Sequence, residues 1–90
     1  MEDDIQTTSL NTLFKTKDIG EAAFLVSLDF LLLRLERINN TNKFYFVFKD
    51  KEKCELNIRK YWNNSIQVTP RKYFEAYKSL KARIFAEEEK

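Results

Sequence analysis

Basic side chains are concentrated in the second half of the sequence, where they could bind phosphate groups. Residues 43–86 carry eleven basic and four acidic side chains, whereas residues 1–42 carry four basic and seven acidic ones. Lysine and arginine neutralise nucleic-acid phosphates and release counterions, so such binding weakens as salt rises. The candidate nucleic-acid-binding residues are Lys60, Arg71, Lys72, Lys78 and Arg83.

These basic residues are also compatible with an ordinary solvated helix face. Glu75 lies four residues after Arg71 and three before Lys78, and opposite charges at these spacings pair along a helix. Arg71 and Lys78 share one helix face, whereas Lys72 and Arg83 lie on a neighbouring one. The sequence therefore leaves open whether this helix contacts an anion or only water.

Two groups of aromatic residues could contact a partner or fill the core. Phe44, Phe46 and Phe48 could stack bases as open sheets do in single-strand binders, but we expect them to be core, because phenylalanine at period two fills buried sheet faces. Tyr61 and Trp62 are the candidate partner-binding residues, since an aromatic pair at a helix end can anchor a protein. Alternatively, the tryptophan closes the core with its N–H at the rim.

Residue types that serve catalysis and metal binding are scarce. The chain has no histidine, one cysteine and one glycine. Histidine is the commonest general base, zinc needs several Cys or His ligands, and a phosphate-cradling loop needs several glycines. We therefore expect no enzyme activity, no cofactor and no metal site, and we expect Cys54 to be a small buried hydrophobe.

The N-terminus and the apolar segments predict a cytoplasmic protein with no membrane partner. The acidic residues 2–4 stand where a signal peptide needs positive charge. The longest apolar stretch, at 22–33, is interrupted by Ser27 and Asp29 and is too short to cross a bilayer. One cysteine cannot form an internal disulfide, which excludes a disulfide-stapled secreted scaffold.

Ninety residues are enough for one domain, which we place at 13–86. Residues 1–12 are polar and lack periodicity, so we expect a flexible tail. A short edge strand at 13–15 precedes a largely apolar helix over about 17–28, for which Thr16 is the expected N-cap.

A β-hairpin is expected in the middle of the chain. In its first strand, near 30–38, Leu31, Leu33 and Leu35 should share one face. The Asn-rich segment 39–42 should form the turn, because asparagine tolerates left-handed backbone conformations. Alternating aromatic residues at 44–48 make the second strand the strongest strand signal in the sequence.

The last part of the chain contains one ambiguous element and one clear one. Residues 51–63 could form a third strand, but we favour a helix capped by Asp50. After a short extended segment at 65–68, Thr69-Pro70 predicts the start of a helix over 70–86. The predominantly acidic C-terminal segment 87–90 should fray. The expected stripe of this helix consists of Tyr73, Phe74, Tyr77, Leu80, Lys81, Ile84 and Phe85.

Several short motifs resemble a known family. They are Thr16-Lys17-Asp18-Ile19, Ala22-Ala23-Phe24-Leu25, Phe46-Val47-Phe48-Lys49-Asp50, Tyr61-Trp62-Asn63, Val68-Thr69-Pro70-Arg71-Lys72-Tyr73-Phe74 and Leu80-Lys81-Ala82-Arg83. Together they resemble a small family of uncharacterised domains from bacteria, phages and mobile elements, over about residues 14–85. The resemblance implies a compact α+β unit in a mobile-element setting, and it transfers no functional residue. Where that family typically has a glycine between the first helix and the first strand, this chain has Leu28-Asp29.

The sequence thus predicts a two-layer α+β domain in which an antiparallel hairpin, extended to as many as four strands, packs against about three helices. We expect a small non-enzymatic binding module. The first hypothesis is an accessory nucleic-acid-binding protein of a phage or mobile element that acts through the basic C-terminal helix. The alternative is a protein-interaction module, either a dimerising adaptor or an inhibitor of a host protein.

Overall fold

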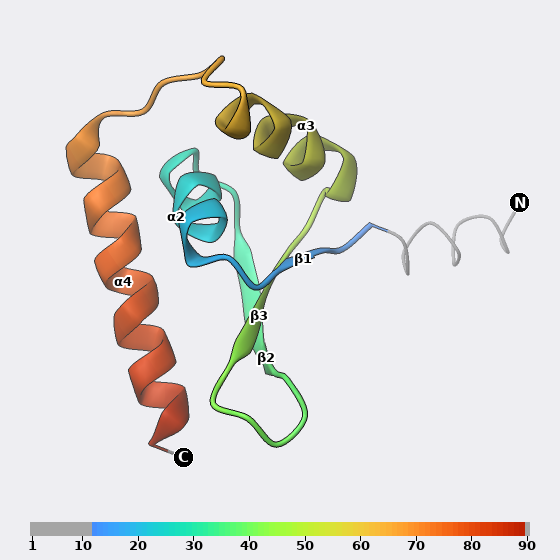
Figure 1. Ribbon diagram of the computed structural model, residues 1–90, viewed down its shortest axis with the longest axis vertical. Coiled ribbons are helices and arrows are strands. Elements are labelled where there is room, and N and C mark those ends of the chain that lie inside the picture. The colour runs from blue at the N-terminus through green and yellow to red at the C-terminus, as the bar shows by residue number, and fades with distance from the viewer. Residues whose placement is uncertain (1–11, 90) are drawn as a thin grey trace, which may run out of the picture.

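The computed structural model describes residues 12–89, which form three helices and a three-stranded antiparallel sheet (Figure 1). The predicted α+β class is therefore confirmed. Of the predicted tail at 1–12, only Thr12 lies within the described residues. The elements are β1 (Phe14–Thr16), α2 (Ile19–Ser27), β2 (Leu32–Arg37), β3 (Phe44–Phe48), α3 (Lys51–Trp62) and α4 (Pro70–Glu88).

The sheet has the order β1-β3-β2, so the aromatic strand lies in the centre. Phe48 pairs with Phe14 of β1 and with Leu32 of β2. A shift of register between Leu32 and Arg34 then breaks the simple alternation of β2. The predicted grouping of Leu31, Leu33 and Leu35 is wrong for this reason. Leu32 packs with Leu35 against the core, while Leu31 is 64% exposed.

The outer face of the sheet is covered by charged side chains. Lys15 of β1 and Arg34 of β2 both pair with Val47 of the central strand. Glu36 accepts from Lys15 at 2.9 Å and lies 2.7 Å from the guanidinium of Arg34. These two cations lower the pKa of the Glu36 carboxyl. The aliphatic parts of such long side chains can cover apolar surface, and Val47 beneath them is fully buried.

Helix α2 lies at the centre of the molecule. It contacts both other helices, and Figure 1 shows α4 running alongside it. Its Phe24 and Leu25 join Phe46 and Phe48 of β3 and Leu80 of α4 in the core, where each is at most 2% exposed. Three elements that are far apart in the sequence therefore share one hydrophobic cluster, which stabilises the fold by removing apolar area from water.

The N-terminus of α2 differs from the expectation. Asp18 is the N-cap, because its Oδ1 accepts from the backbone N–H of Glu21 at 3.0 Å. Thr16, the predicted cap, ends β1, where its hydroxyl accepts from the N–H of Asp18 at 3.1 Å and donates to the Glu21 carboxylate at 2.6 Å. Threonine and aspartate are both favourable N-cap residues, but Thr16 forms part of β1, so Asp18 becomes the cap.

Two helices end in the same hydrogen-bonded motif. After α2, Asp29 takes a φ of 70°, its N–H donates to Val26 O, and the N–H of Phe30 donates to Leu25 O at 3.0 Å. This pair of bonds is a Schellman motif, which usually has glycine at the left-handed position. Asp29 therefore adopts the left-handed conformation at this position without being a glycine.

The end of α3 repeats this geometry. Asn64 has a φ of 57°, its N–H donates to Tyr61 O, and the N–H of Ser65 donates to Lys60 O at 2.9 Å. The helical interpretation of residues 51–63 is thus confirmed. Asp50 stands at the N-cap of α3, but it has a left-handed φ of 60° and its side chain makes no capping hydrogen bond.

Helix α4 starts as predicted and ends two residues later than predicted. The Thr69 hydroxyl accepts from the N–H of Lys72 at 3.2 Å, and Pro70 occupies the first turn. The helix continues to Glu88. Within residues 12–89, no helix is long and apolar enough to cross a membrane.

The predicted apolar stripe of α4 is partly wrong. Leu80 is buried, and Tyr73, Tyr77 and Ile84 pack against the core. In contrast, Phe74 and Phe85 are 59% and 65% exposed. A helix that packs on one side can bury only a limited arc of its surface, and both phenylalanines lie outside that arc.

Candidate nucleic-acid interface

An aromatic and basic stripe runs along the exposed side of α4. Phe74, Lys78, Lys81 and Phe85 are separated by four, three and four residues, so they lie in one row along the helix. We call these four residues the α4 stripe. The ammonium of Lys78 lies 5.3 Å from the ring centroid of Phe74, which is within cation–π range. The row therefore presents ring faces and positive charges together.

The predicted basic residues lie in four different places. Arg71 lies next to the stripe and pairs with Glu75 at 3.4 Å, with side chains 88% and 65% exposed, so this ion pair is weak. Lys78 is in the stripe itself. Lys72 and Arg83 lie on a neighbouring face, as their spacing predicted, and Arg83 lines a hollow beside Leu31. Lys60 lies on α3, which is a separate element.

Sequence reasoning assigned Phe74, Phe85 and Lys81 to the buried side of α4. The polar Lys81 within an otherwise apolar stripe was the signal that could have corrected this assignment. On a helical wheel, Lys81 falls beside Phe74 and Phe85, whereas Tyr73, Tyr77 and Leu80 form a separate arc. A stripe centred on that second arc would have left both phenylalanines outside.

Tyr61, one of the two candidate partner-binding residues, faces the interior. Its ring packs on Phe24 with centroids 4.9 Å apart, and its hydroxyl and that of Tyr73 both lie next to Gly20. Burial raises the pKa of Tyr73 to about 12, and the neighbouring Tyr61 adds to the rise. A Cβ atom at Gly20 would lie 3.0 Å from the Tyr61 hydroxyl, so the glycine permits this close approach.

Trp62, the second of these residues, lies at the surface. Its side chain is 60% exposed, and its indole N–H donates to the carboxylate of Glu21 at 2.7 Å. The adjacent ring of Tyr61 meets it edge-on, with centroids 5.1 Å apart. The indole is thus held in one orientation by contacts on two sides while most of its surface contacts water.

The three phenylalanines of β3 belong to the core, as expected. Phe44, Phe46 and Phe48 are 6%, 2% and 0% exposed, and the guanidinium of Arg37 covers the ring of Phe44 at 4.9 Å. None of these rings is free to stack on a base. Any base-stacking role within the described residues falls to the exposed aromatic side chains of the helices.

Cys54 is a structural residue. It is fully buried on α3, and its thiol donates to the carbonyl oxygen of Lys49 at 3.1 Å. Burial raises the pKa of the thiol to about 11, which suppresses the reactive thiolate. Among residues 12–89, no three His, Cys, Asp or Glu side chains gather in a way that could hold a metal ion.

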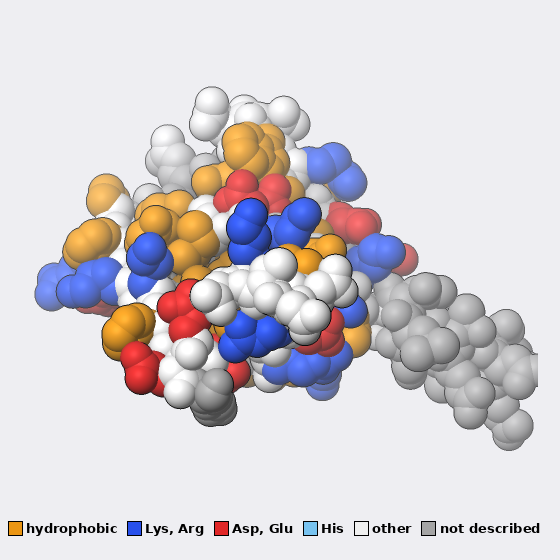
Figure 2. Space-filling model, turned by 60° about the horizontal axis from the view of Figure 1, so that its bottom comes forward, with side chains coloured by type: hydrophobic (Ala, Val, Ile, Leu, Met, Phe, Trp, Pro, Cys, Tyr) orange, Lys and Arg blue, Asp and Glu red, His pale blue; other side chains and the backbone are white. Residues whose placement is uncertain are grey.

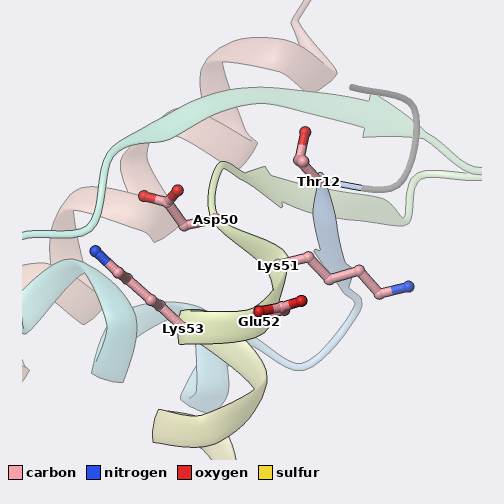
Figure 3. A pocket seen from close by; sticks show the side chains of 5 residues that line it. All are labelled: Thr12, Asp50, Lys51, Glu52 and Lys53. Carbon is pink, nitrogen blue, oxygen red and sulfur yellow. The ribbon is translucent and has the colours of Figure 1, made fainter. Parts of the chain in front are cut away.

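A hollow at the start of α3 contains charges of both signs. Thr12, Asp50, Lys51, Glu52 and Lys53 line this hollow of about 200 Å³. Figure 3 shows the side chains of Lys51 and Lys53 pointing to opposite sides, and Asp50 and Glu52 lie between them. The charges of the two acidic side chains offset those of the two lysines, so this hollow does not favour a phosphate.

The comparison with known families assigns the chain to one of them. A family described as Domain of unknown function (DUF5659) matches residues 11–86, which is most of the chain. The chain belongs to this family. No curated protein and no solved structure matches it. Membership in the DUF5659 family assigns no activity to any residue.

Proposed function

We propose that this DUF5659 domain is a non-enzymatic module that binds single-stranded nucleic acid through α4. The single observation that carries the proposal is the α4 stripe, in which two phenylalanines that the core does not use stand among lysines. Single-strand binders combine positive charge that follows the backbone with aromatic rings on which bases stack. Arg71 and Lys72 extend the positive charge toward the start of the helix.

The charge of α4 supports an anionic partner. From Pro70 to residue 86 the helix carries five basic side chains and one acidic one, Glu75. Because Glu75 is exposed and its pair with Arg71 is weak, a phosphate can compete for that guanidinium at little cost. The proposal includes the bacterial, phage or mobile-element setting that the resemblance implies. We also propose a cytoplasmic location, because a lone cysteine stays reduced there.

The experiment is fluorescence anisotropy with labelled single-stranded and duplex DNA and RNA across a salt series. We expect binding that falls steeply between about 50 and 200 mM salt. The variant Arg71→Glu/Lys72→Glu/Lys78→Glu should lose it. The matched control Lys49→Glu/Lys51→Glu/Lys53→Glu makes the same change of net charge on and before α3, and it should retain most of the affinity.

Two outcomes would overturn the proposal. The first is an absence of binding by the unmodified protein at low salt. The second is an equal loss in the α4 variant and in the control, because overall charge would then account for the binding and the position of the charges would not. Circular dichroism of each variant checks that the fold is retained.

A protein partner is the second candidate function, and Trp62 favours it. An exposed tryptophan that is already held in one orientation loses little side-chain entropy on binding, and such residues dominate protein interfaces. Self-association or capture of a partner through this surface should persist at high salt and be lost in Trp62→Ala. Sedimentation at low and high salt checks the homodimer directly. A salt-sensitive, tryptophan-independent association would exclude this candidate.

A further inference from the structure

A second basic feature lies beside the α4 stripe, in the groove between α4 and the β2–β3 hairpin. Three lysines from three separate segments line it, namely Lys17 before α2, Lys43 before β3 and Lys81 of α4. The groove has a volume of about 260 Å³, and Ile19 and Ile84 contribute to its apolar part. We call it the lysine groove. In the view of Figure 2, basic and hydrophobic side chains lie next to one another across this end of the molecule.

The three lysines of this groove have no counter-charge. Among residues 12–89, no acidic side chain lines the groove, and none of the three lysines makes an ion pair. The outer face of the sheet shows the contrast, since Lys15 there is paired with Glu36 at 2.9 Å. Unpaired like charges around one hollow raise the local positive potential, which an anionic ligand would relieve.

The lysine groove is continuous with the α4 stripe, because Lys81 belongs to both. It follows Lys78 by three residues and precedes Phe85 by four, while its side chain also lines the groove. A chain that stacks its bases on the exposed rings of α4 can therefore direct its backbone into the groove without a break in positive charge.

We infer that the lysine groove binds the phosphate backbone of a single-stranded nucleic acid and makes the domain prefer single strands to duplexes. This inference rests on the proposed function of α4. The lysine ammonium groups hold phosphates, and the apolar side chains Ile19 and Ile84 contact sugar carbons. A duplex is stiff and carries its phosphates on a wide cylinder, so it can contact the convex side of α4 but cannot enter a groove of about 260 Å³.

The test compares Lys17→Gln/Lys43→Gln with the control Lys49→Gln/Lys53→Gln, which removes the same charge elsewhere. Both are measured by anisotropy on single strands of about twelve nucleotides and on the matching duplex. We expect the groove variant to bind single strands about tenfold more weakly, with a salt slope smaller by about 1.4, as two lost phosphate contacts predict. Its duplex affinity and the control's affinities should change less than about twofold.

The result separates this inference from the proposed function. If the unmodified protein binds and the α4 charge-reversal variant does not, while the groove variant binds single strands as the unmodified protein does, the groove inference is overturned and the proposed function stands. An equal loss for single strands and duplexes also overturns the groove inference, since the groove then gives no selectivity. Failure of the unmodified protein to bind any nucleic acid overturns both.

Discussion

Helices α2 and α4 differ in how much of their surface the fold uses. In the nine-residue α2, five residues are buried, including Phe24 and Leu25, whereas in the nineteen-residue α4 only Ala76 and Leu80 are buried. The short helix is enclosed by its neighbours and organises the core. The long helix packs along one side and leaves the other to solvent. Apolar content alone therefore does not locate the core, because α4 displays two large rings in water.

The largest expected effect is on the free energy of unfolding. It tests whether the buried side chains of α2 contribute more to stability than the exposed side chains of α4. Leu25→Ala removes a fully buried side chain and should lower the free energy of unfolding by about 3–4 kcal/mol. Phe74→Ala removes a larger ring from the exposed side of α4 and should cost less than about 0.5 kcal/mol. Urea denaturation measures both. A similar cost for the two variants would contradict this difference between the helices, because α4 would then be enclosed as α2 is.

The second prediction concerns what the exposed side of α4 is for. Phe74→Ala and Phe85→Ala should each weaken binding to single strands by about 1–3 kcal/mol while leaving the fold intact, since each removes a stacking surface. Leu31→Ala is the matched control, because Leu31 is exposed to a similar degree but lies outside the α4 stripe. Unchanged affinity in both phenylalanine variants would mean that the rings take no part in binding.

The third prediction concerns the inner side of α4, where Tyr73 meets Tyr61. Tyr73→Phe removes the hydroxyl that lies near Tyr61 and should cost about 1 kcal/mol at neutral pH. The folded-state pKa of Tyr73 is raised to about 12 from an ordinary value of 10.0, so its contribution to stability is complete below pH 10 and is lost as the pH rises toward 12.

Denaturation curves between neutral pH and pH 12 measure this contribution. The unmodified protein should lose stability faster than Tyr73→Phe over the range from pH 10 to pH 12. Parallel loss in the two proteins would show that Tyr73 is ionised as easily in the folded state as in the unfolded chain, and that this side of α4 is more open to water than the core around α2.

The smallest expected effect concerns the helix ends. Asn64→Gly replaces a left-handed asparagine at the end of α3 and should stabilise the protein by about 0.5 kcal/mol. Asn57→Gly makes the same substitution inside the same helix, where it also removes a hydrogen bond to Lys53 O, and should destabilise it. Thermal denaturation separates the two. Stabilisation by both variants would contradict the assigned role of the backbone conformation.

Local signals in the sequence predicted much of the fold. The alternation in Phe44–Phe48 identified the central strand, and Thr69-Pro70 located the start of α4 to the residue. Each of these signals is complete within a few neighbouring residues. The start of α2 was misplaced because Thr16 and Asp18 are both good caps, and only the pairing of Thr16 with Phe46 decides between them.

The candidate site was less predictable for a physical reason. The basic face of α4 follows from helical spacing, so Arg71 and Lys78 could be grouped from the sequence alone. The lysine groove could not be predicted from the sequence, because Lys17, Lys43 and Lys81 belong to segments that only the tertiary fold brings together. Which arc of α4 is buried also depends on where α2 lies, and within α4 itself the polar Lys81 is the one signal that bears on it.

The register shift in β2 has a consequence for the behaviour of concentrated protein. β2 forms one edge of the sheet, and an irregular, charged edge strand is a poor template for a strand from another molecule. Deletion of Leu33 would make the ladder regular between Leu32 and Arg34. The edge of the sheet would then be flatter and could pair more easily with a strand from another molecule. The extra residue, Leu33, thereby makes this edge of the sheet a poorer partner for a strand from another molecule.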